Sequence, residues 1–167
     1  LSSGVGIASL VILNEQMLSL VSSPKLTLDV FFLGFSFPIS LITMSMMVSY
    51  MPRPKRRWEI LVDQTIFWAV NLGVIIFFVF IILENVYAEL ASSLILYTAV
   101  FMLFWRFLRH AAPVRQASVL LSGMIFLLWT GLTGVFYIVQ YWVPAFTEGK
   151  DLVLISHTTV ALYGWNL

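Results

Sequence analysis

The sequence predicts an all-α protein, a polytopic bundle of about six transmembrane helices joined by short loops. Of its 167 residues, 60% are hydrophobic and only 10% are charged, whereas soluble domains average about 25% charged residues. The apolar residues also form long stretches, most of them near the ~20 residues that a helix needs to cross a bilayer. We therefore expect an integral, multi-pass membrane protein with the lipid bilayer as its main solvent.

Six apolar stretches follow one another along the chain, and we expect a helix over each. Only short segments remain between them, so the chain is expected to form one transmembrane domain. The last stretch is shorter than ~20 residues, and we expect the protein to continue beyond it. The six stretches are Gly4–Val21, Leu28–Met51, Ile60–Leu83, Val86–Phe107, Ala117–Val143 and Leu152–Leu167.

Basic residues follow the second and the fourth stretch. An alternating path through the membrane puts both segments on the same face, which holds seven of the nine Lys and Arg residues. The positive-inside rule makes this face cytoplasmic and predicts that both termini are cytoplasmic too. The basic residues on this face are Arg53, Lys55, Arg56, Arg57, Arg106, Arg109 and Arg115.

Small residues and one proline predict details of the packing. Small side chains let membrane helices approach closely, so we expect contacts where they recur at helical spacing. Pro38 is expected to bend the second helix, because it lacks a backbone N–H. The small residues at helical spacing are Ser36 and Ser40, Ser118 and Ser122, and Gly131 and Gly134.

Two segments of the chain are similar to each other. Asp29–Phe37 and Thr159–Leu167 align without a gap, with a glycine and then an aromatic residue at matching positions. Both follow an apolar stretch and an outer loop, which suggests that residues 4–51 are repeated as 117–167. Chance similarity between two apolar helices is the alternative interpretation.

Two motifs lie beside this similarity. Met51-Pro52-Arg53-Pro54 precedes Trp68-Ala69-Val70-Asn71-Leu72-Gly73, and Ser156-His157 precedes Gly164-Trp165. In these motifs the chain resembles the small haem-copper-oxidase-like membrane proteins, which are related to subunit I of cytochrome oxidases and nitric oxide reductases. The resemblance implies a redox-associated subunit in a prokaryotic plasma membrane. It covers about half of the chain.

The chain departs from this family at most of the expected histidine positions. The second stretch has Thr27 and Asp29 where the family has two histidines, and the sixth has His157 but then Thr159. One ligand position therefore matches, which argues against a dinuclear haem-copper centre. The resemblance is compatible with a haem-bearing subunit and with a degenerate, accessory one.

His157 is the leading candidate for a haem ligand, because neutral imidazole is a common axial ligand of haem iron. Met17 is expected at about the same depth, so the two side chains could ligate one haem together. The alternative is a structural histidine that hydrogen-bonds to Ser156, Thr158 or a neighbouring helix.

Other polar residues inside the stretches are candidates for proton or solute movement, because such groups are costly in a membrane. Glu15 and Asn71 could line a polar pathway with His157. Glu15 could instead touch headgroups, and Asn71 is expected to hydrogen-bond across helices. Asp63 is expected to pair with Arg56 or Arg57.

The basic loop is expected to bind anionic lipid headgroups through Arg53, Lys55, Arg56 and Arg57. Absence of cysteine excludes disulfides and thiolate chemistry, and no nucleotide-binding or hydrolase motif is found. The net charge of +1 argues against nucleic acid as a partner. The predicted function is a membrane subunit of a redox complex, more an accessory than a catalyst, with other subunits or further copies as partners. The alternative is a small transporter or channel.

Overall fold

A computed structural model describes residues 37–110, 117–140, 142–143 and 149–161, and the single residues 6, 9, 12 and 13. Five helices form these ranges: α3 Phe37–Tyr50, α4 Arg57–Ile82, α5 Val86–His110, α6 Ala117–Val139 and α7 Lys150–Thr159. The stretch expected over 4–21 lies outside the described residues, apart from four single positions, and so do most of the two similar segments Asp29–Phe37 and Thr159–Leu167. The expected bend at Pro38 stays a prediction, because the helical turn before Phe37 also lies outside the described residues.

Three of these helices are long and apolar enough to cross a membrane. They are α4, α5 and α6, with 26, 25 and 23 residues. Helix α3 is apolar as well, but its described part has 14 residues. The all-helical class is thus confirmed for this part of the chain, and three of the expected spans are helices that could cross a membrane. The total of about six spans and the location of the termini remain predictions.

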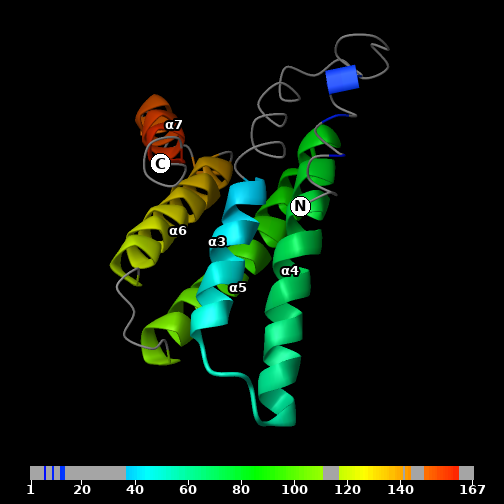
Figure 1. The fold of residues 1–167 in the computed structure, drawn as a ribbon. Coiled ribbons are helices and arrows are strands. Elements are labelled where there is room, and N and C mark those ends of the chain that lie inside the picture. The colour runs from blue at the N-terminus through cyan, green and yellow to red at the C-terminus, as the bar shows by residue number, and fades with distance from the viewer. Residues whose placement is uncertain are drawn as a thin grey trace.

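Consecutive helices run antiparallel and form an open array (Figure 1). Helix α4 packs on α5, α5 on α6 and α6 on α7, while α3 makes a smaller contact with α5. Helices α4 and α7 therefore lie towards opposite ends of this array.

A three-residue turn, Leu83–Asn85, reverses the chain between α4 and α5. The Asn85 N–H donates to the carbonyl of Phe80 (3.1 Å) and the Glu84 N–H to that of Ile81 (3.2 Å), which satisfies the last carbonyls of α4. Glu84 takes the positive φ of 54° that this helix end requires and that glycine usually supplies. The Asn85 side chain then accepts from the Ala88 N–H (3.2 Å) and caps the start of α5.

The basic loop precedes α4 and has its own cap. The Glu59 carboxylate accepts hydrogen bonds from the backbone N–H groups of Lys55 (2.9 Å) and Arg56 (3.2 Å). A carboxylate in the first turn also interacts favourably with the positive end of the helix dipole. The loop lies at the same end of the array as the last turn of α5 (Figure 1), as the alternating path requires.

An ion pair joins α4 and α5 near this end. The expectation that Asp63 pairs with Arg56 or Arg57 was wrong, because the carboxylate of Asp63 pairs with the guanidinium of Arg106. Helix α4 carries Asp63 past the loop into contact with α5, and the antiparallel hairpin brings Arg106 to the same level. The two side chains are 33% and 21% exposed. The pair therefore sets the register of the hairpin in a partly desolvated position.

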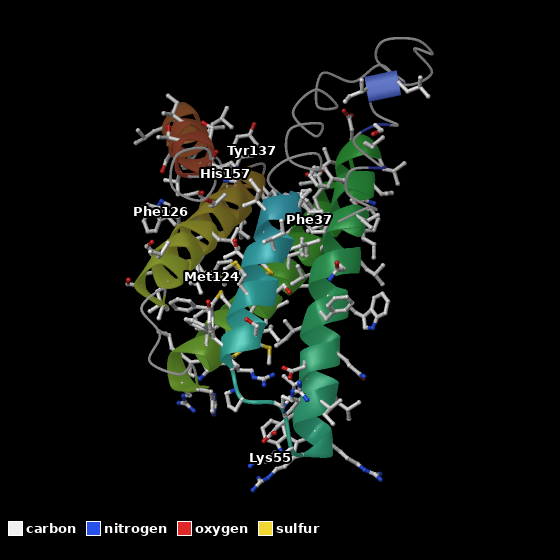
Figure 2. All side chains as sticks on the ribbon, in the orientation of Figure 1. Phe37, Lys55, Met124, Phe126, Tyr137 and His157 are labelled. Carbon is white, nitrogen blue, oxygen red and sulfur yellow. The ribbon has the colours of Figure 1, made fainter. Side chains whose placement is uncertain are left out.

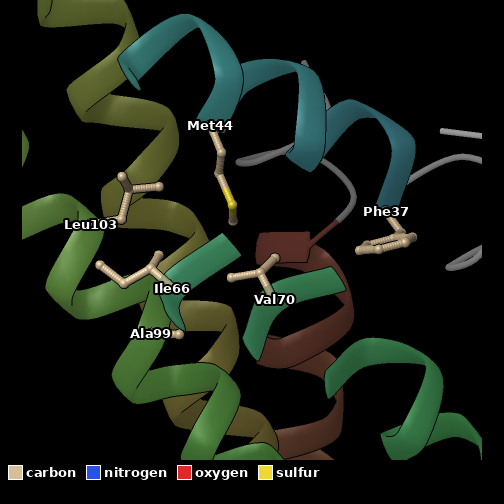
Figure 3. Packing of buried hydrophobic residues seen from close by; sticks show 6 residues of the cluster. All are labelled: Phe37, Met44, Ile66, Val70, Ala99 and Leu103. Atoms are coloured by element: carbon tan, nitrogen blue, oxygen red, sulfur yellow. The ribbon is translucent and has the colours of Figure 1, made fainter. Parts of the chain in front are cut away.

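Two clusters of buried side chains hold α3 against the other helices. Figure 3 shows the first, in which side chains from α3, α4 and α5 converge. In the second, Met47 of α3 meets residues of α5 and α6, among them Phe107 and Met124. Phe107, Met47 and Met124 are the most fully buried large side chains in the described part. Methionine suits this place because its flexible side chain fills irregular gaps. The first cluster consists of Phe37, Met44, Ile66, Val70, Ala99 and Leu103.

Small residues mark two of the helix contacts, one at Gly131, as expected, and one at Gly73, which was not among the expected positions. A Cβ atom added at Gly131 of α6 would lie 2.9 Å from the Tyr97 ring of α5, closer than real contacts allow. One at Gly73 of α4 would lie 3.0 Å from Leu96. Ser118 and Ser122, in contrast, are exposed on α6, so this pair lines no contact in the described part of the chain.

We expect Asp63→Asn to lower the free energy of unfolding by about 1–3 kcal/mol, because it weakens charge-assisted hydrogen bonds. The measurement is denaturation of the detergent-solubilised protein, carried out as a double-mutant cycle with Arg106→Gln. In the Arg106→Gln background, Asp63→Asn should lower the free energy of unfolding by much less. Additive effects of the two substitutions would contradict the pairing.

Gly131→Leu should lower the free energy of unfolding by about 1–3 kcal/mol, because overpacking drives α5 and α6 apart. Thermal denaturation in detergent measures the loss. The control is Gly149→Leu, where an added Cβ meets nothing within 4 Å. Equal losses in the two variants would show that the close approach of Gly131 to Tyr97 does not limit packing.

Candidate functional site

His157 lies where α7 packs on α6. It occupies the last turn of α7 and is partly exposed. The opposite end of the array carries the basic loop, as the labels of His157 and Lys55 in Figure 2 show.

One ring nitrogen of His157 faces α6. Nδ1 lies 3.0 Å from the carbonyl oxygen of Thr130 and 3.1 Å from the hydroxyl oxygen of Thr133. A carbonyl oxygen only accepts, so Nδ1 carries the proton and donates. The Thr133 hydroxyl has acceptors of its own, because it lies 3.0 Å from the carbonyls of Trp129 and Thr130. This network assigns the lone pair of the neutral ring to Nε2.

A glycine makes this position of the ring possible. A Cβ atom at Gly134 would lie 3.2 Å from Cε1 and 3.6 Å from Nδ1 of His157, which is tighter than most real contacts. The surface that receives the ring is therefore formed by Thr130, Thr133 and Gly134, which share one face of α6. Of the alternatives open at the sequence level, the hydrogen bond to a neighbouring helix is the one observed.

This arrangement holds the imidazole in one orientation. Metal-bound histidines usually donate their other ring N–H to a carbonyl or carboxylate, which sets the tautomer and raises the basicity of the ligating nitrogen. The Thr130 carbonyl takes that position here, and Nε2 is the basic nitrogen. The same arrangement also serves a histidine whose role is to join two helices or to accept a proton.

Asn71 is satisfied by its own helix. Its side-chain nitrogen donates to the carbonyl oxygen of Phe67, one turn earlier in α4 (2.7 Å). The expected hydrogen bond across helices is therefore not the one observed. The structure does not bring Asn71 and His157 together, since α5 and α6 lie between α4 and α7 in the array.

The remaining predicted site residues fall into two groups. Met17 and Glu15 lie outside the described residues, so the proposed ligand pair and the outer part of the polar pathway stay predictions. The basic loop residues are all exposed, as contact with lipid headgroups requires. They are Arg53, Lys55, Arg56 and Arg57.

Sequence reasoning missed the partners of His157 on α6 and a buried polar group on α5. The spacing of Thr130, Thr133 and Gly134, which puts two hydroxyls and a gap on one face, was an available signal. The buried group is Glu89, which is only 7% exposed and lies in the first turn of α5. Gln140, which directly follows the last residue of α6, is also buried and is 6% exposed.

Among the residues that the structure describes, no three His, Asp or Glu side chains come together in a group that could hold a metal ion. Comparison of the chain with models of protein families, with curated proteins and with solved structures found no match.

The hydrogen bond to Thr130 predicts the tautomer of His157. In ¹⁵N-histidine-labelled protein, His110→Gln leaves a single histidine, and at a pH where the ring is neutral its NMR signals should show a protonated Nδ1. Thr133→Val should preserve this tautomer, because the Thr130 carbonyl remains. Gly134→Leu should disturb it by displacing the ring. A protonated Nε2 in the unsubstituted site would contradict the assignment.

Proposed function

We propose that the chain is an integral membrane subunit of a respiratory or other redox complex in a prokaryotic plasma membrane. In this role it contributes helices to the assembly and is not itself the catalyst. One observation carries the assembly part of this proposal: the described helices leave much of their apolar surface uncovered by one another. Phe67 and Trp68 of α4 are 57% and 56% exposed, and Trp129 of α6 is 51% exposed.

Exposed aromatic residues on several helices fit a protein with neighbours in the membrane. Lipid covers such surfaces, and so do helices of other subunits. Within the membrane, association depends on close packing and interhelical hydrogen bonds more than on hydrophobicity. The exposed apolar side chains of α4 and α6 are suited to such contacts. Further copies of the same chain could also pack against these exposed apolar surfaces.

The redox part of the proposal rests on the family resemblance and on His157. A haem-bearing form of the subunit is the second candidate, and the fixed imidazole of His157 favours it. Its Nε2 would hold the iron, and Met17 or a residue of a partner would complete the ligation. A bound haem would supply one-electron transfer. The role of this chain would be to hold the ring against Thr130 and Thr133.

A transport function receives less support from the geometry. Its proposed pathway joins Glu15, Asn71 and His157, and the two described members lie on helices separated by α5 and α6. The Asn71 amide is also engaged by its own helix.

The test is to isolate the tagged full-length protein from its native membrane in mild detergent. We expect it to copurify with subunits that contain redox cofactors, identified by mass spectrometry. Oxidised and dithionite-reduced absorption spectra of the same sample distinguish the two forms. His157→Ala should abolish a haem band if the chain is haem-bearing and leave the spectrum unchanged if it is accessory.

The control for the spectrum is His110→Ala, which removes the other histidine, at the opposite end of the array. It should leave the spectrum unchanged in either form. Isolation of the protein alone, without a redox partner and without a haem band, would contradict the proposal and favour transport.

A further inference from the structure

A shallow groove lies between α4 and α5. Its volume is about 310 Å³. Its base includes the small side chains of Ala69 and Ala99, and its rim includes Ile95, Thr98 and Met102. The three rim residues are exposed. The side chain of Thr98 turns its hydroxyl to the carbonyl of Leu94 (2.8 Å), so the groove presents an almost entirely apolar surface.

The groove continues along α5 towards the basic end. A second hollow of about 160 Å³ is lined by Phe101, Met102 and Trp105, and Met102 lines both. From Ile95 to Trp105 the helix rises about 15 Å. This length equals half of the ~30 Å hydrocarbon core of a bilayer, which is the depth of one leaflet.

The side chain of Arg109 lies at the end of this path. The Arg109 guanidinium is 4.5 Å from the centre of the Trp105 ring, and the Trp105 ring stacks on Phe101. Thr98, Met102, Trp105 and Arg109 recur at intervals of three or four residues and so share one face of α5. In the described part of the chain Arg106 is the arginine that pairs with a carboxylate, through Asp63, and no such ion pair is found for Arg109.

We propose that this groove is a binding site for an anionic phospholipid. One acyl chain lies along α5 from Trp105 towards Ile95, and the phosphate binds the Arg109 guanidinium. The indole of Trp105 lies between the two, at the level of the headgroup boundary that tryptophan prefers. This site does not depend on the redox role, because it requires only that α4 and α5 are embedded in a membrane.

The charge at one end of the groove favours a phospholipid over an apolar partner helix. A phospholipid has adjacent apolar and anionic parts, which match the apolar lining and the Arg109 guanidinium beside Trp105. The basic loop attracts anionic lipid in general, whereas the groove fixes the position of one molecule.

The experiment uses the full-length chain in nanodiscs of phosphatidylcholine and phosphatidylglycerol in equal amounts. The probe is a phosphatidylglycerol with a photoreactive diazirine in its acyl chain, and mass spectrometry maps the labelled peptides. We expect labelling to concentrate on residues 94–105, and an excess of unlabelled phosphatidylglycerol to compete better than phosphatidylcholine. Arg109→Gln should lower this labelling about fivefold, the effect of one cation near an anionic surface. Arg109→Lys should retain most of it.

A second pair of variants tests the groove itself. Thr98→Trp fills it and should abolish labelling of residues 94–105, whereas Thr98→Val has nearly the size of threonine and should preserve the labelling. Circular dichroism and size-exclusion chromatography verify that the variants are folded. Equal labelling of all exposed helices, equal competition by the two lipids, or protection of the groove by a copurifying protein would each overturn the proposal.

Discussion

In the hydrocarbon core of a bilayer there is no water to bond with the backbone, so each amide and carbonyl placed there needs a partner within the protein. Helices α4, α5 and α6 meet this requirement by length and regularity. The turn at Leu83–Asn85 meets it too, because its backbone and the Asn85 side chain satisfy both adjoining helix ends. The same requirement governs most polar side chains of the described helices. Asn71, Thr98 and Thr130 all donate to a carbonyl one turn earlier.

In the described part of the chain, two polar contacts join neighbouring helices at opposite ends of the array. Asp63 with Arg106 sets the level of α4 against α5, and His157 with Thr130 and Thr133 sets α7 against α6. Both contacts depend on groups that would be costly in lipid without a partner. In such helices, interhelical hydrogen bonds and small residues take over the role that hydrophobic burial has in water. Gly134 beside His157 shows both effects at one contact.

The open array also accounts for the two proposals about partners. Helices that leave aromatic faces uncovered need lipid or other subunits beside them, and the proposed assembly into a larger complex follows from that need. The groove between α4 and α5 differs from the rest of this surface because it combines a narrow apolar path with the Arg109 cation. A ligand with one acyl chain and one negative charge would contact both the apolar path and the Arg109 cation.

Much of the fold was open to prediction from the sequence, since its composition and the length of its apolar stretches are local properties. The structure places helices within a few residues of the expected ranges from α4 to α6, and the basic segments at one end. The partners of polar side chains were harder to predict. Asp63 was expected to pair with Arg56 or Arg57, but it pairs with Arg106 of the neighbouring helix. Asn71 was expected to hydrogen-bond across helices, but it donates to the Phe67 carbonyl of its own helix. In each case more than one partner was within reach of the side chain.

The sequence by itself therefore determined the helical class and the apolar stretches that are long enough to cross a membrane, and it placed the basic segments together at one end. Only the tertiary structure decided which nitrogen of His157 carries the proton, which arginine pairs with Asp63 and where α4 and α5 leave a groove. The physical reason is that these features depend on the relative rotation and height of neighbouring helices. The pattern of apolar residues in the sequence restrains this rotation and height only weakly, because lipid and the protein interior are equally apolar.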